Sequence, residues 1–190
     1  MRTLLLVRHA ATSATRAAAF PAGEGLDDRG RSQAAGIAAS LPRHTQVLAS
    51  PARRCRETAA AAGLEAVVDA GIAECDFGAW AGRTLAELSA AEPGAVQSWM
   101  LDPEAAPHGG ESLAVFSARI AGWLDAQAQL DGRVAAVTHA EVVKAAVVHA
   151  LDAPLAAFWR IDSSPLALTE LHAHDGRWTL VRLNAPLTPP

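Results

Sequence analysis

The chain has 190 residues, 51% of them apolar and 19% charged, which suits one compact domain with a sizeable core and excludes a disordered chain. Its formal net charge of −4 gives no sign of a nucleic-acid or membrane surface, and no apolar run approaches the roughly 20 residues of a membrane helix. Two cysteines without metal-type spacing, and no signal-peptide pattern, predict a cytoplasmic protein with reduced thiols.

The first dozen residues form the pattern of a buried strand that ends in a cation and an imidazole. Residues 4–7 are an unbroken apolar run, as expected of a strand covered on both faces, and Arg8-His9 follows directly. The carboxyl edge of a central strand is where open α/β folds build their sites. We therefore expect Arg8 and His9 to lie at such a site.

The next elements alternate between helix and strand. A helix is predicted over residues 27–42, with one apolar stripe, and a second strand over residues 46–49. Another helix is expected over residues 50–63, with Ser50 as its N-cap. Residues 66–68 form the pattern of a third strand.

The middle of the chain is predicted to leave the sheet. Proline and glycine recur through residues 79–110, which we expect to form a small, partly helical cap, called the excursion below. Within it, residues 84–89 favour a helix. A longer helix is predicted from Glu111 or Ser112 to about residue 131.

The last third of the chain repeats the opening pattern. Residues 133–138 form an apolar strand that ends in His139, and a helix is predicted over residues 141–151. The remaining predictions are closing strands at residues 158–161, 166–172 and 178–183, with a turn at His174-Asp175-Gly176. This order predicts a single domain over residues 1–190, an α/β/α sandwich with a mostly parallel central sheet.

Four side chains can meet at one edge of that sheet. His9 and His139 each end an apolar strand, Arg8 precedes His9, and Arg54 lies early in the helix after another strand. Guanidinium groups match phosphate oxygens bidentately, so two arginines beside two imidazoles suit a phosphoryl group. The helix predicted after His139 adds backbone N–H groups to the same place, and Ala140 is expected to contact the phosphate there.

A reaction follows from these groups. A neutral imidazole can attack phosphorus and form a phosphohistidine. The leaving alkoxide then needs a proton, and Glu74, among glycines after the third strand, is the best candidate to supply it. A carboxyl group that faces a phosphate is pushed toward its protonated form, which suits an acid.

Six motifs, in order, carry a resemblance to a known family. They are LLVRHAAT at 5–12, LDDRGRSQA at 26–34, SPARRCRETA at 50–59, ECDFGAWAG at 74–82, GGES at 109–112 and VTH at 137–139. The chain therefore resembles the histidine phosphatase superfamily, the phosphoglycerate mutase-like or "RHG" enzymes, over nearly its whole length. The resemblance implies that His9 is the phosphorylated nucleophile and that Glu74 is the proton donor and later the base for water. It implies a phosphate pocket completed by Arg8, Arg54 and His139, with no metal or other cofactor.

The chain departs from the family pattern in a few places. Ala10 stands where the family usually has glycine, Thr15 where asparagine is frequent, and Ala81 where glutamate is common. A hydroxyl at Thr15 can still donate to a phosphate oxygen. Contacts with the leaving group are expected from Trp80, Arg83, Trp99 and His108.

The leading hypothesis is a metal-independent phosphomonoesterase that hydrolyses a small phosphorylated metabolite. A cofactor-dependent phosphoglycerate mutase is the alternative, although the mutases that the chain resembles are longer and shield the phosphohistidine from water. A non-catalytic module that binds a phosphate ligand is a third reading. His172 and His174 have the spacing of a metal pair but lack a third ligand, so no metal site is expected. Nucleic-acid and membrane partners are not expected, and strands near the C-terminus could pair in a homodimer.

Overall fold

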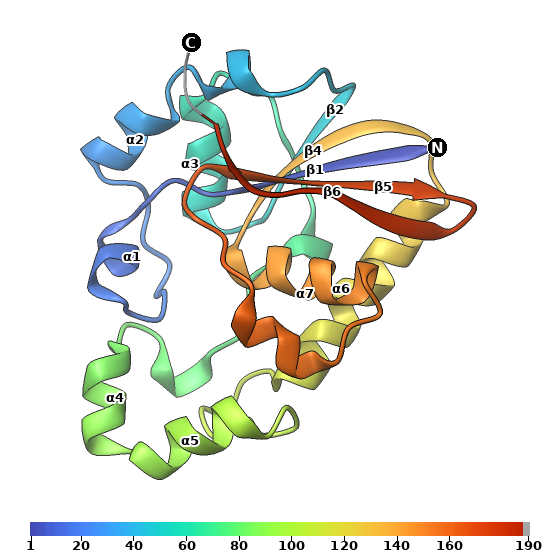
Figure 1. Cartoon of the computed structure of the whole chain (residues 1–190). Helices are drawn as coiled ribbons and strands as arrows, with labels where there is room; N and C mark the ends of the chain where they lie inside the picture. Colours follow the sequence, from blue (N-terminus) through green and yellow to red (C-terminus); the bar gives the residue numbers. More distant parts are fainter. Residues whose placement is uncertain (188–190) are drawn as a thin grey trace.

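The computed structural model describes residues 1–187 and contains a six-stranded sheet in the order β3-β2-β4-β1-β5-β6 (Figure 1). The strands are β1 (Arg2–Arg8), β2 (Gln46–Ala49), β3 (Val67–Val68), β4 (Gly132–Thr138), β5 (Ala167–His174) and β6 (Arg177–Pro186). The strands β1 to β4 pair in parallel, and β5 and β6 pair antiparallel. The predicted α/β class with a mostly parallel sheet is confirmed.

Helices cover both faces of the sheet. One face carries α2 (Asp28–Ala34) and α3 (Arg53–Ala61), and the other carries α6 (Leu113–Ala128) and α7 (Ala140–Ala150) (Figure 1). The remaining helical segments are α1 (Ser13–Ala17), η1 (Ile37–Ser40), η2 (Ala70–Ile72), η3 (Gly78–Trp80), α4 (Leu85–Ala91), α5 (Pro93–Leu101) and η4 (Leu155–Arg160).

Strand β1 is buried on both sides, as its apolar run predicts. Leu4 and Leu6 pack into the cluster on the α6–α7 face, whereas Leu5 and Val7 pack into the cluster beneath α2 and η1. All four side chains are fully buried. Burial of each contributes roughly 1.5–3 kcal/mol, which fixes the strand and therefore the position of the residues that follow it.

The excursion lies on the α6–α7 side, away from the sheet (Figure 1). Its helix α4 begins with a capping box, in which Thr84 and Glu87 each bond the other's backbone N–H. The backbone of Phe20, in the loop after α1, bonds the excursion twice, through the Arg83 carbonyl at 2.9 Å and the Gly82 N–H at 2.8 Å. The chain just after β1 is thereby tied to a segment far along the sequence.

Three local predictions are wrong. The helix over residues 27–42 is broken, because Ala35 is extended and Gly36 takes a φ of 85°, so α2 ends and the short η1 follows. Residues 158–161 belong mostly to η4 and not to a strand, because a short apolar run does not distinguish the two. Ser50 does not cap α3, whose N-cap is Ala52.

Within residues 1–187, none of the helices combines the length and the hydropathy that a membrane crossing requires.

Candidate active site

The two predicted histidines leave the sheet side by side. β1 and β4 pair with Arg8 opposite Thr138, so the next residue on each strand is a histidine. The His9 N–H donates to the Thr138 carbonyl at 2.8 Å, which continues the pairing one step past the strand. The His9 and His139 rings meet edge to face, with centroids 5.4 Å apart. Parallel pairing therefore places both imidazoles at one point.

His9 is held in one tautomer by its neighbour in the chain. Its Nδ1 lies 2.7 Å from the Ala10 carbonyl oxygen, which can only accept, so Nδ1 carries the proton. Nε2 is then unprotonated, and the Arg54 Nε–H donates to it at 3.2 Å. Burial holds the pKa of His9 well below its usual value, and His139 and Arg54 add to this shift. The ring is therefore neutral near pH 7, with the Nε2 lone pair directed into the site.

The guanidinium of Arg54 connects the site residues. Arg54 lies in the first turn of α3 and its side chain is only 2% exposed. Its Nη2 contacts His139 Nδ1 at 3.1 Å and forms an ion pair with Glu74 Oε2. Burial disfavours the charged form, but the groups around it, chiefly the Glu74 carboxylate, together raise the pKa of Arg54. A permanent cation is thus fixed beside both imidazoles.

Glu74 reaches the same cluster from the segment between η2 and η3. Its Oε1 lies 3.3 Å from His139 Nδ1, and its other oxygen pairs with Arg54. Burial raises the pKa of Glu74, although Arg54 opposes the shift and Glu24 adds to it. A carboxyl group that keeps its proton to a higher pH can act as a general acid.

Arg8 ends β1 at the edge of the cluster. Its Nη1 donates to the Ser163 carbonyl, in the loop after η4. Its Nε is buried, as is Ser163 Oγ, and neither atom has a hydrogen-bond partner within residues 1–187. Arg8 therefore keeps a donor for an anionic ligand.

His139 is supported by two residues whose side chains the sequence did not place in the site. Ser50 Oγ lies 2.7 Å from His139 Nε2, and Cys55 Sγ lies 3.5 Å from the same nitrogen. Burial lowers the pKa of His139 to about 3, so the ring is neutral. Burial raises the pKa of Cys55 to about 12, so it remains a thiol. The sequence motif includes Ser50 but predicts a helix-capping role for its hydroxyl group, whereas the structure places that group against His139.

Glu24 is a further group that the sequence reasoning missed. Its Oε1 lies 3.8 Å from Arg54 Nη1 and accepts a hydrogen bond from Thr12 Oγ1 at 3.3 Å. The backbone N–H of Ala22 donates to the other carboxylate oxygen at 2.9 Å. A single acidic residue in a loop of small residues carries no signal of its own, so only the fold reveals this contact.

The departures from the family pattern occupy ordinary positions. Ala10 is fully buried, has no positive φ, and donates its N–H to Thr58 Oγ1 at 3.0 Å. The backbone there accepts a side chain without strain. Thr15 lies in α1, where its Oγ1 is 3.1 Å from Thr12 Oγ1 in a capping box.

Ala140 is the first residue of α7, so its backbone N–H has no partner within that helix.

The expected leaving-group contacts are only partly brought together. Arg83 pairs with Glu92 inside the excursion. His108 is buried, with its ring centroid 5.1 Å from that of Trp80, and its Nδ1 accepts from the Gly110 N–H at 3.1 Å. Neither Arg83, Trp80 nor His108 lines the cavity beside the site, whereas Trp99 does. In residues 1–187 no group of three or more His, Cys, Asp or Glu side chains is placed to hold a metal ion.

Comparisons with known proteins agree with this geometry. A sequence model of the histidine phosphatase superfamily (branch 1) matches residues 4–186. The bifunctional protein Rv2228c of Mycobacterium tuberculosis is 32% identical over 183 residues, covering 90% of this chain and 50% of the relative. Phosphoserine phosphatase 1 of Hydrogenobacter thermophilus is 29% identical over 195 residues, covering 97% of this chain and 92% of the relative.

Solved structures show the same architecture. A mycobacterial glucosyl-3-phosphoglycerate phosphatase in complex with VO3 superposes with a TM-score of 0.84 at 28% sequence identity, covering 97% of this chain and 100% of the other. The chain spans about half the length of the mycobacterial bifunctional protein that it matches in sequence.

Proposed function

This chain belongs to branch 1 of the histidine phosphatase superfamily, and we propose that it hydrolyses the phosphate monoester of a small metabolite through a phosphohistidine at His9. The observation that carries the proposal is the state of His9. Its Nδ1 is held by a carbonyl oxygen at 2.7 Å, and its Nε2 faces the Arg54 guanidinium at 3.2 Å. A neutral nucleophile beside a buried cation is what attack on a phosphoryl group requires.

The first half of the reaction transfers the phosphoryl group to the enzyme. His9 Nε2 forms a bond to phosphorus as the ester P–O bond breaks. The proton stays on His9 Nδ1, which continues to donate to the Ala10 carbonyl oxygen. Arg8, Arg54 and the α7 N-terminus stabilise the charge on the phosphoryl oxygens. The leaving alkoxide takes the proton of Glu74, whose raised pKa suits this role.

The second half returns the enzyme to its starting state. Water attacks the phosphohistidine, the P–N bond breaks, and the Glu74 carboxylate takes a proton from that water. Inorganic phosphate leaves, and His9 Nε2 regains its lone pair. The relatives named as phosphoserine and glucosyl-3-phosphoglycerate phosphatases support a small phosphorylated metabolite as the substrate class.

Phosphate release from 4-nitrophenyl phosphate in the presence of EDTA tests the hydrolysis. We expect turnover with the chelator and an acid-labile, base-stable phosphoenzyme in rapid-quench samples. His9→Ala should lower kcat at least about a thousandfold and remove the phosphoenzyme, because the nucleophile is lost. His174→Ala, which changes an exposed histidine at the end of β5, is the matched control.

Two results would contradict the proposal. Full activity in His9→Ala would exclude the covalent step. Formation of 2-phosphoglycerate from 3-phosphoglycerate that outpaces phosphate release would indicate a mutase.

A further inference from the structure

A cavity of about 190 Å³ lies beside the cluster, between the excursion and α7. Two of its lining residues are close in sequence to residues of the proposed active site, because Cys75 follows Glu74 and Glu141 follows His139 by two residues. Most of the wall is apolar, and six of its residues carry aromatic rings. The rings come from Phe20, Phe77, Trp99, Phe116, Phe158 and Trp159. A leaving group attached to a phosphate at His9 therefore has an apolar space to enter.

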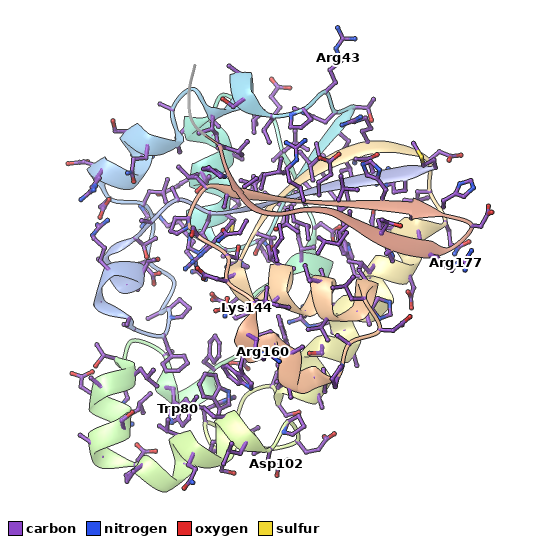
Figure 2. The ribbon with its side chains drawn as sticks, viewed as in Figure 1. Arg43, Trp80, Asp102, Lys144, Arg160 and Arg177 are labelled. Atoms are coloured by element: carbon purple, nitrogen blue, oxygen red, sulfur yellow. The ribbon has the colours of Figure 1, made fainter. Side chains whose placement is uncertain are left out.

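One cation lies in this apolar wall. Lys144 is the only lysine in the chain, and it lines the cavity from the side of α7 that faces the excursion (Figure 2). It follows Ala140 by four residues, which is about 6 Å along a helix axis. Its Nζ lies 5.4 Å from the centroid of the Phe158 ring. Within residues 1–187 no carboxylate lies within ion-pair distance of that ammonium group.

Glu141 also lines the cavity, three residues before Lys144. It lies in the first turn of α7, next to the site. Burial lowers the pKa of Arg8, and Glu141 is the strongest of the charges that oppose that shift. The carboxylate of Glu141 thus favours the charged form of Arg8. One turn further along α7, Lys144 forms no ion pair within residues 1–187 and lies beside the Phe158 ring.

We propose that Lys144 selects phosphate esters whose leaving group carries a carboxylate on an apolar or ring-shaped body. The inference rests on the function proposed above and names the substrate class of the same site. The rings accept the body of the leaving group, and the ammonium group attracts its carboxylate. In a low-dielectric wall such an attraction is stronger than at an exposed surface. A leaving group about 6 Å long reaches from the first turn of α7 to this cation.

Two matched esters test this assignment. 4-Carboxyphenyl phosphate and 4-carbamoylphenyl phosphate have almost the same shape, but only the first carries a charge on its ring substituent. We expect the wild type to hydrolyse the carboxylate ester with a kcat/KM roughly 5- to 20-fold higher, mainly through a lower KM. In Lys144→Met the ratio of the two kcat/KM values should fall to about one, and Lys144→Arg should restore most of it.

The controls separate this inference from the function on which it rests. Arg43→Met removes an exposed cation at the far end of the molecule (Figure 2) and should keep the wild-type ratio. No hydrolysis of either ester, or of phenyl phosphate, would contradict the proposed function itself. Hydrolysis of all three with a ratio near one in the wild type would overturn only the role of Lys144. An equal loss on both esters in Lys144→Met would also overturn it.

The single lysine allows a second measurement. In the His9→Ala protein, acetic anhydride should label Lys144, and mass spectrometry of peptides distinguishes this amine from that of Met1. We expect 4-carboxyphenyl phosphate to slow labelling of Lys144 several-fold more than the carbamoyl ester does, while labelling of Met1 is unchanged. Equal protection by the two esters would overturn the proposal.

Discussion

Glu24 lies beside the Arg54 guanidinium and acts on the site through charge. Its carboxylate is 3.8 Å from Arg54 Nη1 and is oriented by Thr12 and Ala22. Because like charges disfavour ionisation, it raises the pKa of Glu74, in addition to the larger effect of burial. Glu24 is therefore a positioning residue that raises the pKa of the proposed proton donor, Glu74.

Replacing Glu24 by glutamine removes this charge and keeps the shape of the side chain. The pKa of Glu74 should fall, so the high-pH limb of kcat, where the acid loses its proton, should move to lower pH. The pH profile of 4-nitrophenyl phosphate hydrolysis measures the shift. Asp28→Asn, an exposed carboxylate at the start of α2, is the control and should leave the limb in place. A limb that stays fixed or moves upward in Glu24→Gln would contradict this account.

At the scale of single residues, motif spacing predicts which side chains of a strand or helix lie at the sheet edge. Arg54 is buried while Arg53 and Arg56 are exposed, because only one face of α3 is turned to β4. The motif selects the buried one. Side chains such as Glu24 and Ser50 enter the site through loop geometry, which no local pattern encodes. Their contacts could be found only in the fold.

At the scale of elements, the break between α2 and η1 shows where periodicity fails. The apolar stripe continues through residues 34–41, yet the chain turns at Gly36, which has a φ of 85°. The short η1 already buries Ile37 in the core beneath the sheet, so a continuous helix is not needed for this packing. The stripe predicts which residues are buried and does not predict that the backbone stays helical between them.

Two glycine substitutions test this explanation as a matched pair. An added Cβ meets nothing within 4 Å at either Gly36 or Gly122, but Gly36 has a positive φ and Gly122 lies inside α6. Gly36→Ala should lower the free energy of unfolding by about 1–2 kcal/mol through backbone strain. Gly122→Ala should raise it by roughly 0.5–1 kcal/mol, since alanine favours helices. Urea denaturation measures both. Unchanged or higher stability in Gly36→Ala would mean that the segment can close into one helix.

At the scale of the whole molecule, the parallel register of β1 and β4 determines the site. Arg8 lies opposite Thr138, and their successors are the two histidines. Apolar runs that end in histidine predict this meeting, because carboxyl ends of parallel strands share one edge. The cavity wall could not be predicted in the same way. It combines α7, η4 and the excursion, whose relative placement depends on packing of aromatic residues that are far apart in sequence.

The register that unites the histidines also makes the fold sensitive to acid. His9 and His139 are buried, with pKa values well below 6.5 and about 3 respectively, so the unfolded chain binds protons that the folded chain does not. Above pH 6.5 both rings are neutral in the folded and the unfolded chain, and below it they destabilise the fold progressively as the pH falls toward the folded values. Between pH 6.5 and pH 5, His139 should lower the free energy of unfolding by about 1.5–2 kcal/mol, and His9 acts in the same direction. Glu74 opposes this loss, because its raised pKa favours the folded state at low pH.

Urea denaturation at a series of pH values measures this slope. The wild type should lose stability steeply below pH 6.5, and His139→Asn should show a slope lower by about one proton, because the asparagine does not titrate. His174→Asn, at the exposed last residue of β5, should keep the wild-type slope. If His139→Asn and the wild type lose stability in parallel, His139 is not neutral in the folded protein. His9, the proposed nucleophile, would then lie beside a charged imidazolium, which the contact of His139 with Arg54 at 3.1 Å disfavours.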